Sequence, residues 1–165
     1  MDAIDLLEQQ HEAVTEMMDE LKESSPGRER NETFKKLQHS LLAHMVIEEE
    51  LFYPALVSRT ENGEPVAEGY EEHSGARVSL TRCSRALKED DLFKVRIGVL
   101  KEMFSHHVKG ERGAILPEAK KLLPDDEREK LGMKMETMFE KVSKSGGVGA
   151  ELDRKTTARE LDALG

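Results

Sequence analysis

The stretch HMVIEEELFYP, residues 44–54, decides how this chain folds. Its histidine precedes its first glutamate by four residues, so the two side chains lie on one face of a helix, one turn apart. The stretch HVKGERGAILP, residues 107–117, repeats that order, and in both stretches a proline stands at the tenth position after the histidine. A single His/Glu pair is common in helices, but its repetition predicts two halves of one metal site.

The composition indicates a single helical domain. The chain has 165 residues, of which 37% are hydrophobic, 36% charged and 4% aromatic. This length suffices for one domain with its own core, and the balance suits amphipathic helices better than a β fold. The formal net charge of -9 at pH 7 disfavours binding to a phosphate backbone, so no nucleic-acid partner is expected.

Cysteine usage and the N-terminus predict a soluble, cytoplasmic protein. The single cysteine, Cys83, rules out an internal disulfide framework and fits a reducing compartment; we expect it to pack in the core. Residues 1–5 carry no basic region and lead into no long apolar segment, so they do not read as a secretory signal. No apolar run approaches the roughly 20 residues that a membrane helix needs, and no membrane partner is expected.

Apolar residues recur at alternating intervals of three and four, the pattern of helices that pack in a bundle. Asp2 is a predicted N-cap. Pro54 is expected to weaken or kink the second helix, whose apolar face is predicted to continue through Leu51 and Ala55, as that of the fourth continues to Ala114. Breaks between helices are predicted at residues 24–27, 62–65 and 89–91. Four long segments with short connections predict an all-α, up-down-up-down four-helix bundle.

The chain continues beyond this bundle. A fifth, more polar helix is predicted from Pro124 to about Val142. From Ser143 the composition turns to glycine, serine and charged residues, which predicts a flexible tail. The expected organisation is a metal-binding bundle over residues 1–142, including the additional C-terminal helix, and a flexible C-terminal tail over residues 143–165.

Each of the four bundle helices places one histidine on its apolar face, and the second and fourth add a glutamate one turn later. Leu or Ile is expected at such positions, and burying each polar group unpaired would cost roughly several kcal/mol. Six such groups in one domain need a shared compensation, for which a metal centre is the natural candidate. The predicted ligands are His11, His44, Glu48, His73, His107 and Glu111.

Four imidazoles and two carboxylates are too many for one tetrahedral zinc ion, but they divide evenly over two metals. If Glu48 and Glu111 both bridge, each metal receives two nitrogens and two oxygens. An oxo or hydroxo bridge would add a fifth ligand and leave an open position on each metal. This mixed ligation suits two iron ions and redox or dioxygen chemistry, with manganese or a mixed pair as the alternative. Because the histidines must be neutral to ligate, acid should release the metal.

These motifs resemble the hemerythrin-like proteins of the HHE cation-binding type over residues 1–122. The resemblance implies a non-haem di-iron centre with two bridging carboxylates. Members of that family bind dioxygen, sense oxygen or iron, decompose peroxide, or handle nitric oxide and damaged iron–sulfur centres. The matching features are Gln10-His11-Glu12, His44 and Glu48 with Glu49 and Tyr53-Pro54, Glu72-His73, and His107 and Glu111 with Leu116-Pro117.

Arg77 departs from the oxygen-carrying branch of that family, in which a second histidine follows His73 by four residues. With four histidines both irons should be accessible, which favours reactivity over oxygen carriage. We therefore expect a reaction with dioxygen, peroxide or nitric oxide in oxidative or nitrosative stress defence, with catalase-like peroxide decomposition favoured. The alternative is an oxygen or iron sensor, or a store, without turnover. A third reading is a structural metal site, which zinc would fill as well as iron.

Several neighbouring residues have simpler interpretations. His39 falls off the apolar face and is expected at the surface. His106 is the rival of His107 as a ligand, but the repeat and the helical phase both select His107, leaving His106 a supporting position. Tyr70 either packs in the core or lies near the site as a hydrogen-bond donor or radical trap. The pair Glu49-Glu50 is expected to form a solvated edge.

Overall fold

Helices account for nearly all of the computed structural model, which describes residues 1–144. The described part of the chain contains no strand. Two π-helical turns, η1 (Glu48–Phe52) and η2 (Glu111–Ile115), join α2 to α3 and α5 to α6. The helices are α1 (Ala3–Glu23), α2 (Arg28–Ile47), α3 (Tyr53–Val57), α4 (Glu64–Ser84), α5 (Asp90–Gly110), α6 (Leu116–Leu122) and α7 (Asp125–Lys144).

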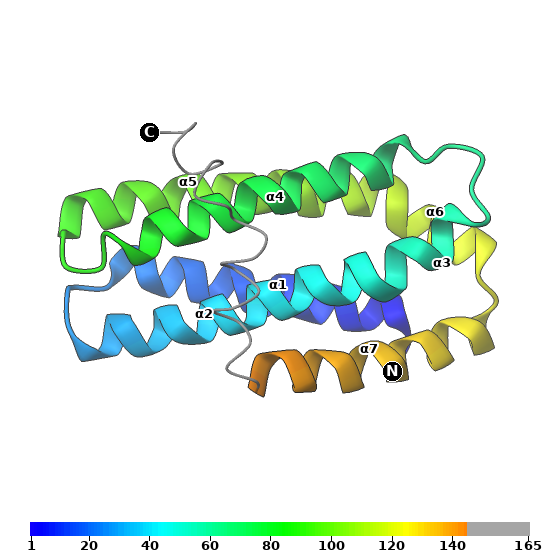
Figure 1. Ribbon diagram of the computed structural model, residues 1–165, viewed down its shortest axis with the longest axis horizontal. Coiled ribbons are helices and arrows are strands. Elements are labelled where there is room, and N and C mark those ends of the chain that lie inside the picture. Colours follow the sequence, from blue (N-terminus) through cyan, green and yellow to red (C-terminus); the bar gives the residue numbers. More distant parts are fainter. Residues whose placement is uncertain (145–165) are drawn as a thin grey trace.

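The four long helices α1, α2, α4 and α5 form the bundle, with α7 packed along α2 and α1 on the outside (Figure 1). The predicted all-α bundle with an additional C-terminal helix is therefore confirmed. The helix α7 reaches Lys144, the last described residue, slightly beyond the predicted Val142. Most of the predicted tail, residues 145–165, lies outside the described residues. Among residues 1–144, no helix is long and apolar enough to cross a membrane.

Local sequence signals explain most helix ends. The Asp2 carboxylate accepts a hydrogen bond from the backbone N–H of Ile4 at 2.8 Å, which confirms the predicted N-cap of α1. Gly27 precedes α2 with φ 150°, in the region that favours glycine. The acidic residues expected as a break that can cap the next helix lie at the start of α5, with Glu89 at the N-cap position and Asp90 and Asp91 in the first turn. Carboxylates there face the positive end of the helix dipole.

The two π-helical turns correct the predicted helical phase. Each begins at the glutamate of a His/Glu pair, and each inserts one residue into the helix before the proline. One extra residue rotates everything after it by about 100°. Leu51 and Ala55 are accordingly only half-buried, whereas Phe52, Tyr53 and Leu56 are buried in their place.

The fourth helix shows the same shift. Ala114, predicted on the apolar face, is exposed, while Ile115 and Leu116 are buried. The prolines explain this shift. Pro54 and Pro117 have no N–H to donate in an α-helical ladder, and the π-helical hydrogen bonds before them accommodate the missing donor. The helix is therefore neither ended nor sharply broken at Pro54, but continues as α3 with its faces turned.

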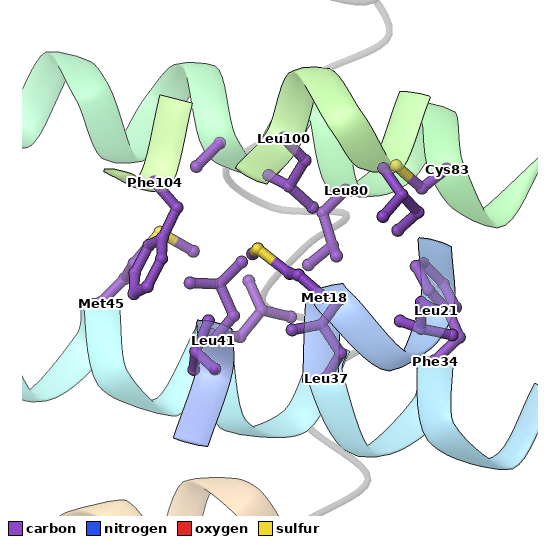
Figure 2. Close-up of a cluster of buried hydrophobic side chains, with 14 of the residues drawn as sticks. Met18, Leu21, Phe34, Leu37, Leu41, Met45, Leu80, Cys83, Leu100 and Phe104 are labelled. Atoms are coloured by element: carbon purple, nitrogen blue, oxygen red, sulfur yellow. The ribbon is translucent and has the colours of Figure 1, made fainter. Parts of the chain in front are cut away.

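Two apolar clusters fill the interior, one on each side of a polar layer. The first lies among the long helices and includes Met18, Leu41, Leu80 and Phe104 (Figure 2). The second occupies the other end of the bundle, where α3, α6 and α7 close it, and includes Tyr53. The polar layer between them contains the histidines and glutamates predicted as ligands.

Candidate metal centre

The structure brings all six predicted ligand residues together in that polar layer. They come from α1, α2, η1, α4, α5 and η2, and none is more than 4% exposed. Each residue reaches the centre because it replaces a core residue on the inner face of its helix. The set comprises His11, His44, Glu48, His73, His107 and Glu111.

Glu48 stands at the middle of one half of the layer. Its Oε1 lies 3.4 Å from Nε2 of His44, and its Oε2 lies 3.0 Å from Nε2 of His73 and 3.6 Å from Nε2 of His107. Three imidazoles from three helices therefore direct the same ring nitrogen at one carboxylate.

Glu111 occupies the corresponding place in the other half. Its Oε2 lies 3.1 Å from Nε2 of His11 and 3.8 Å from Nε2 of His107. One ligand atom each from His11, His44, Glu48 and His107 lies within 4.8 Å of the other three. His107 is near both carboxylates, so the two halves form one continuous cluster.

The opposite ring nitrogens are held from outside the cluster. Nδ1 of His44 lies 2.9 Å from Oε1 of Gln10, and Nδ1 of His107 lies 2.8 Å from Oε2 of Glu72. Nδ1 of His73 lies 2.9 Å from Oε1 of Glu49. Because each of these oxygens accepts the Nδ1 proton, the lone pair of the ring is left on the inward Nε2.

His11 is held more loosely on that side. Its Nδ1 has no hydrogen-bond partner within residues 1–144, and the carboxylate of Glu8 lies 3.9 Å away, beyond hydrogen-bond distance. The Glu8 carboxylate is instead engaged by the guanidinium of Arg112. Arg112 thus approaches the cluster through Glu8.

The inward atoms have no protein hydrogen-bond partner, although several approach one another closely. Their contacts fail hydrogen-bond geometry among the described residues, and atoms buried in this way are costly unless something else satisfies them. Imidazole nitrogens and carboxylate oxygens are suitable ligands for first-row transition metals. The unpartnered atoms are Nε2 of His11, His44, His73 and His107, both carboxylate oxygens of Glu48, and Oε2 of Glu111.

Comparison with known proteins agrees with this geometry. The family model of the hemerythrin HHE cation-binding domain matches residues 2–119. The chain belongs to the hemerythrin HHE cation-binding family. The crystal structure of a hemerythrin HHE cation-binding domain-containing protein from Mycobacterium kansasii has the same fold, with a TM-score of 0.80 at 24% identity, over 94% of this chain and 99% of that one. The curated proteins gave no significant match.

Tyr53 adds a hydrogen bond to this HHE centre that the sequence did not identify. It is fully buried, and its hydroxyl donates to Oε1 of Glu111 at 3.0 Å. Its ring stacks on that of His73, with centroids 5.6 Å apart and planes 17° apart. Gly69 on α4 makes room for it, because a Cβ there would lie 2.7 Å from the Tyr53 hydroxyl. Burial raises the pKa of Tyr53, so the phenol stays protonated and remains a donor.

Arg77 and Glu49 form a buried ion pair behind His73. The guanidinium lies 2.8 Å from Oε1 of Glu49, donates to Oε2 at 2.9 Å, and is 3% exposed. Glu49 therefore contacts His73 and Arg77 together, and the prediction that Glu49 lies at a solvated edge is wrong. Glu50 alone is exposed. Arg77, at the position of the second histidine of oxygen carriers, contacts Glu49.

The π-turn η1 also accounts for Tyr70. In the π-helical register Pro54 would bond to the carbonyl of Glu49, as Tyr53 N–H bonds to that of Glu48. Pro54 has no N–H, and the Tyr70 hydroxyl donates to the Glu49 carbonyl instead, at 3.1 Å. Tyr70 is 37% exposed, so of its two predicted roles the hydrogen bond near the site is the one observed.

The protein's own groups leave the centre electrostatically unbalanced. Burial lowers the pKa of His44 to about 3. Burial also opposes protonation of His107, but the carboxylates of Glu48 and Glu72 outweigh it and raise that pKa to about 10. Burial favours a higher pKa for Glu48, yet the surrounding imidazoles hold it well below its usual value. Burial and the Glu48 charge raise the pKa of Glu111. A cation would relieve the repulsion between the two carboxylates.

The remaining candidates lie outside the cluster. The His106 side chain is 75% exposed, with its Nε2 3.4 Å from Oε1 of Glu72, so it adjoins the partner of His107 and not the centre. His39 is half-buried, and its Nδ1 lies 2.8 Å from the backbone oxygen of Ser143. Cys83 is fully buried in the first apolar cluster, which confirms the prediction of a packing role.

Proposed function

We propose that this HHE domain holds two iron ions and decomposes peroxide as part of a defence against oxidative or nitrosative stress. The observation that carries the proposal is the set of inward-facing imidazole and carboxylate atoms without protein partners. Six buried candidate ligands exceed the four of a tetrahedral zinc site, and mixed nitrogen and oxygen ligation suits iron. Manganese or a mixed pair is the less favoured alternative.

The ligand roles follow from the positions of the two glutamates. Glu48 lies among three imidazoles and Glu111 near two, so each carboxylate is placed to bridge. His11, His44, His73 and His107 would then be terminal ligands through Nε2. Arg77 contacts Glu49, which leaves four histidines for two ions. A centre with four histidines supports reactivity at both ions, in keeping with the departure from the oxygen carriers.

The reaction converts two molecules of hydrogen peroxide into two of water and one of dioxygen. Bound iron would supply the redox change, taking electrons from one peroxide and giving them to the other. The chain contributes the orientation of each imidazole through Gln10, Glu49 and Glu72. It also places a hydrogen-bond donor at the centre, since the Tyr53 hydroxyl donates to Glu111. Apolar clusters on both sides keep bulk water out.

Metal analysis and a peroxide assay test the proposal together. Protein purified with iron should contain about two irons per chain, by the ligand count above, and should release oxygen from peroxide in an oxygen electrode. A stable spectral change without oxygen release would instead favour an oxygen or iron sensor, or a store. One zinc and no iron per chain would contradict the di-iron assignment and favour a structural site.

Two substitutions test the ligand set, and a third provides the matched control. Glu111→Ala and His44→Ala each remove a buried donor of the centre and should lose metal, whereas His39→Ala lies away from it and should retain the full amount. Full metal content in Glu111→Ala would refute the bridging role of that carboxylate.

A further inference from the structure

A small cavity lies directly beside the metal centre. Its volume is about 10 Å³, and three of the candidate ligands, His44, His73 and His107, form part of its wall. The rest is mostly apolar, with Phe104 and Met103 contributed by α5. A space of that size holds about one water-sized molecule. A diatomic ligand or peroxide therefore needs a wall residue to move, and a flexible one is the natural candidate.

A larger groove lies between α4 and α5. Its volume is about 460 Å³. Its wall includes Val95 and Val99, which are 63% and 49% exposed, and also Gly75 and Met103. Such exposure of branched apolar side chains has no packing role in the described part of the chain. Most of the lining is apolar, which suits small uncharged molecules, and the two arginines in it, Arg82 and Arg96, disfavour cations.

Met103 belongs to the walls of both the groove and the cavity. Gly75 faces it across the helix pair, and a Cβ at Gly75 would lie 3.0 Å from the Met103 methyl carbon. Glycine inside a helix costs about 1 kcal/mol relative to alanine, and here its absence of a side chain gives the thioether room against α4. Methionine is unbranched with three rotatable bonds, so it changes rotamer readily.

We propose that small uncharged ligands reach the metal centre through the α4/α5 groove, past a movable Met103 side chain that rests against Gly75. The inference rests on the proposed metal function, because it requires a ligand-binding centre behind Met103. It assigns to this site an access route for dioxygen, nitric oxide or undissociated hydrogen peroxide. Met103 then controls the rate of entry and exit without contributing to the affinity.

Nitric oxide binding to the iron(II)-loaded protein tests the route, with association followed by stopped flow and dissociation by trapping the released ligand. Met103→Ala should raise both rate constants about tenfold, which corresponds to about 1.4 kcal/mol of barrier. Met103→Phe should lower both by a similar factor. The equilibrium dissociation constant and the iron content should stay unchanged in both variants, because a gate alters the barrier and not the end states.

Variants at three other positions distinguish a gate at Met103 from a general disturbance of the packing. Val99→Trp changes an exposed residue one helical turn before Met103 and should also lower both rates. Met133→Phe, at a methionine 54% exposed on α7, is the matched control and should change neither. A rival entrance would pass His106 and Glu72, because Glu72 also borders the cavity. If ligands enter through the α4/α5 groove, His106→Phe should leave both rate constants unchanged.

The outcomes distinguish a failure of the proposed access route from a failure of the proposed metal function. If the native protein holds no iron or gives no nitric oxide signal, the proposed function fails. If it binds nitric oxide and the Met103 and Val99 variants keep native rates, or if His106→Phe alone slows binding, the route is wrong. A change in affinity or iron content in the Met103 variants would also overturn it, since the residue would then act on the centre itself.

Discussion

Tyr53→Phe removes one hydroxyl and nothing else from the metal centre. That hydroxyl donates to Glu111 at 3.0 Å, and both residues are buried. Phe keeps the ring that stacks on His73, so no cavity forms. The hydrogen bond contributes about 1 kcal/mol to stability if Glu111 is protonated and roughly 1.5–3 kcal/mol if it is ionised. For a chain of this length, 1.5–3 kcal/mol corresponds to a fall in Tm of roughly 3–12 °C.

Differential scanning calorimetry of the metal-loaded and chelator-treated protein measures this fall, and absorption spectroscopy follows the centre. The loaded variant should also show a shifted ligand-to-metal band, because Glu111 loses its donor. Tyr70→Phe is the matched control, since it removes the chain's other phenol hydroxyl, from a more exposed residue that donates to a backbone carbonyl. It should leave the band unchanged.

Gly69→Ala perturbs the same hydrogen bond from the opposite helix. Its Cβ would lie 2.7 Å from the Tyr53 hydroxyl, so the phenol must move away from Glu111. In a Tyr53→Phe background that clash is relieved in part, and the two changes together should cost less than their sum. Strict additivity, or a native Tm and band in Tyr53→Phe, would refute the idea that this phenol supports the centre.

Three further predictions concern the buried charges. Removing the metal should lower Tm, because a ligand at a thousandfold excess over its Kd stabilises the fold by about 4 kcal/mol; equal Tm values with and without chelator would contradict a bound metal. Arg77→Met should cost roughly 3–5 kcal/mol in urea unfolding by leaving the Glu49 carboxylate buried without its partner, and adding Glu49→Gln should recover part of it. The metal-free protein should be most stable near neutral pH. His44 has a pKa of about 3 in the folded state against 6.5 in the unfolded state, so its contribution to stability is lost as the pH falls below 6.5. His107 has a folded pKa of about 10, so its contribution is lost as the pH rises toward that value. A flat pH profile of the urea midpoint would refute both assignments.

Helical periodicity was sufficient to predict the bundle and to select the six residues that meet at its centre. The choice of His107 over His106 rested on the repeat and on the helical phase, and the structure buries the first and exposes the second. This works because a residue's place on a helix face depends only on its distance from neighbours in the same helix. The repeat of His, Glu and Pro supplied the pairing of the two halves.

Partners from other helices could not be predicted in this way. Gln10 and Glu72 adjoin histidines in the sequence, yet each holds the histidine of another helix, His44 and His107. Periodicity places a side chain on a face but does not say which neighbour it meets across the bundle. Glu49 was misassigned for the same reason, because its partners His73 and Arg77 both lie on α4.

The shift of the buried helix face after each glutamate could have been predicted from the prolines. Pro54 and Pro117 each follow a bridging candidate by six residues, and in both places a π-turn begins at that glutamate. The added residue turns Tyr53 inward, where it bonds Glu111 in the other half of the site. One half of the repeat thus supplies the phenol that supports the carboxylate of the other. The corresponding residue in the second stretch, Leu116, carries no such group, so the phenol hydrogen bond distinguishes Glu111 from Glu48, although the repeat makes the two carboxylates equivalent. For the proposed peroxide reaction, we expect this asymmetry to give the two carboxylates separate roles.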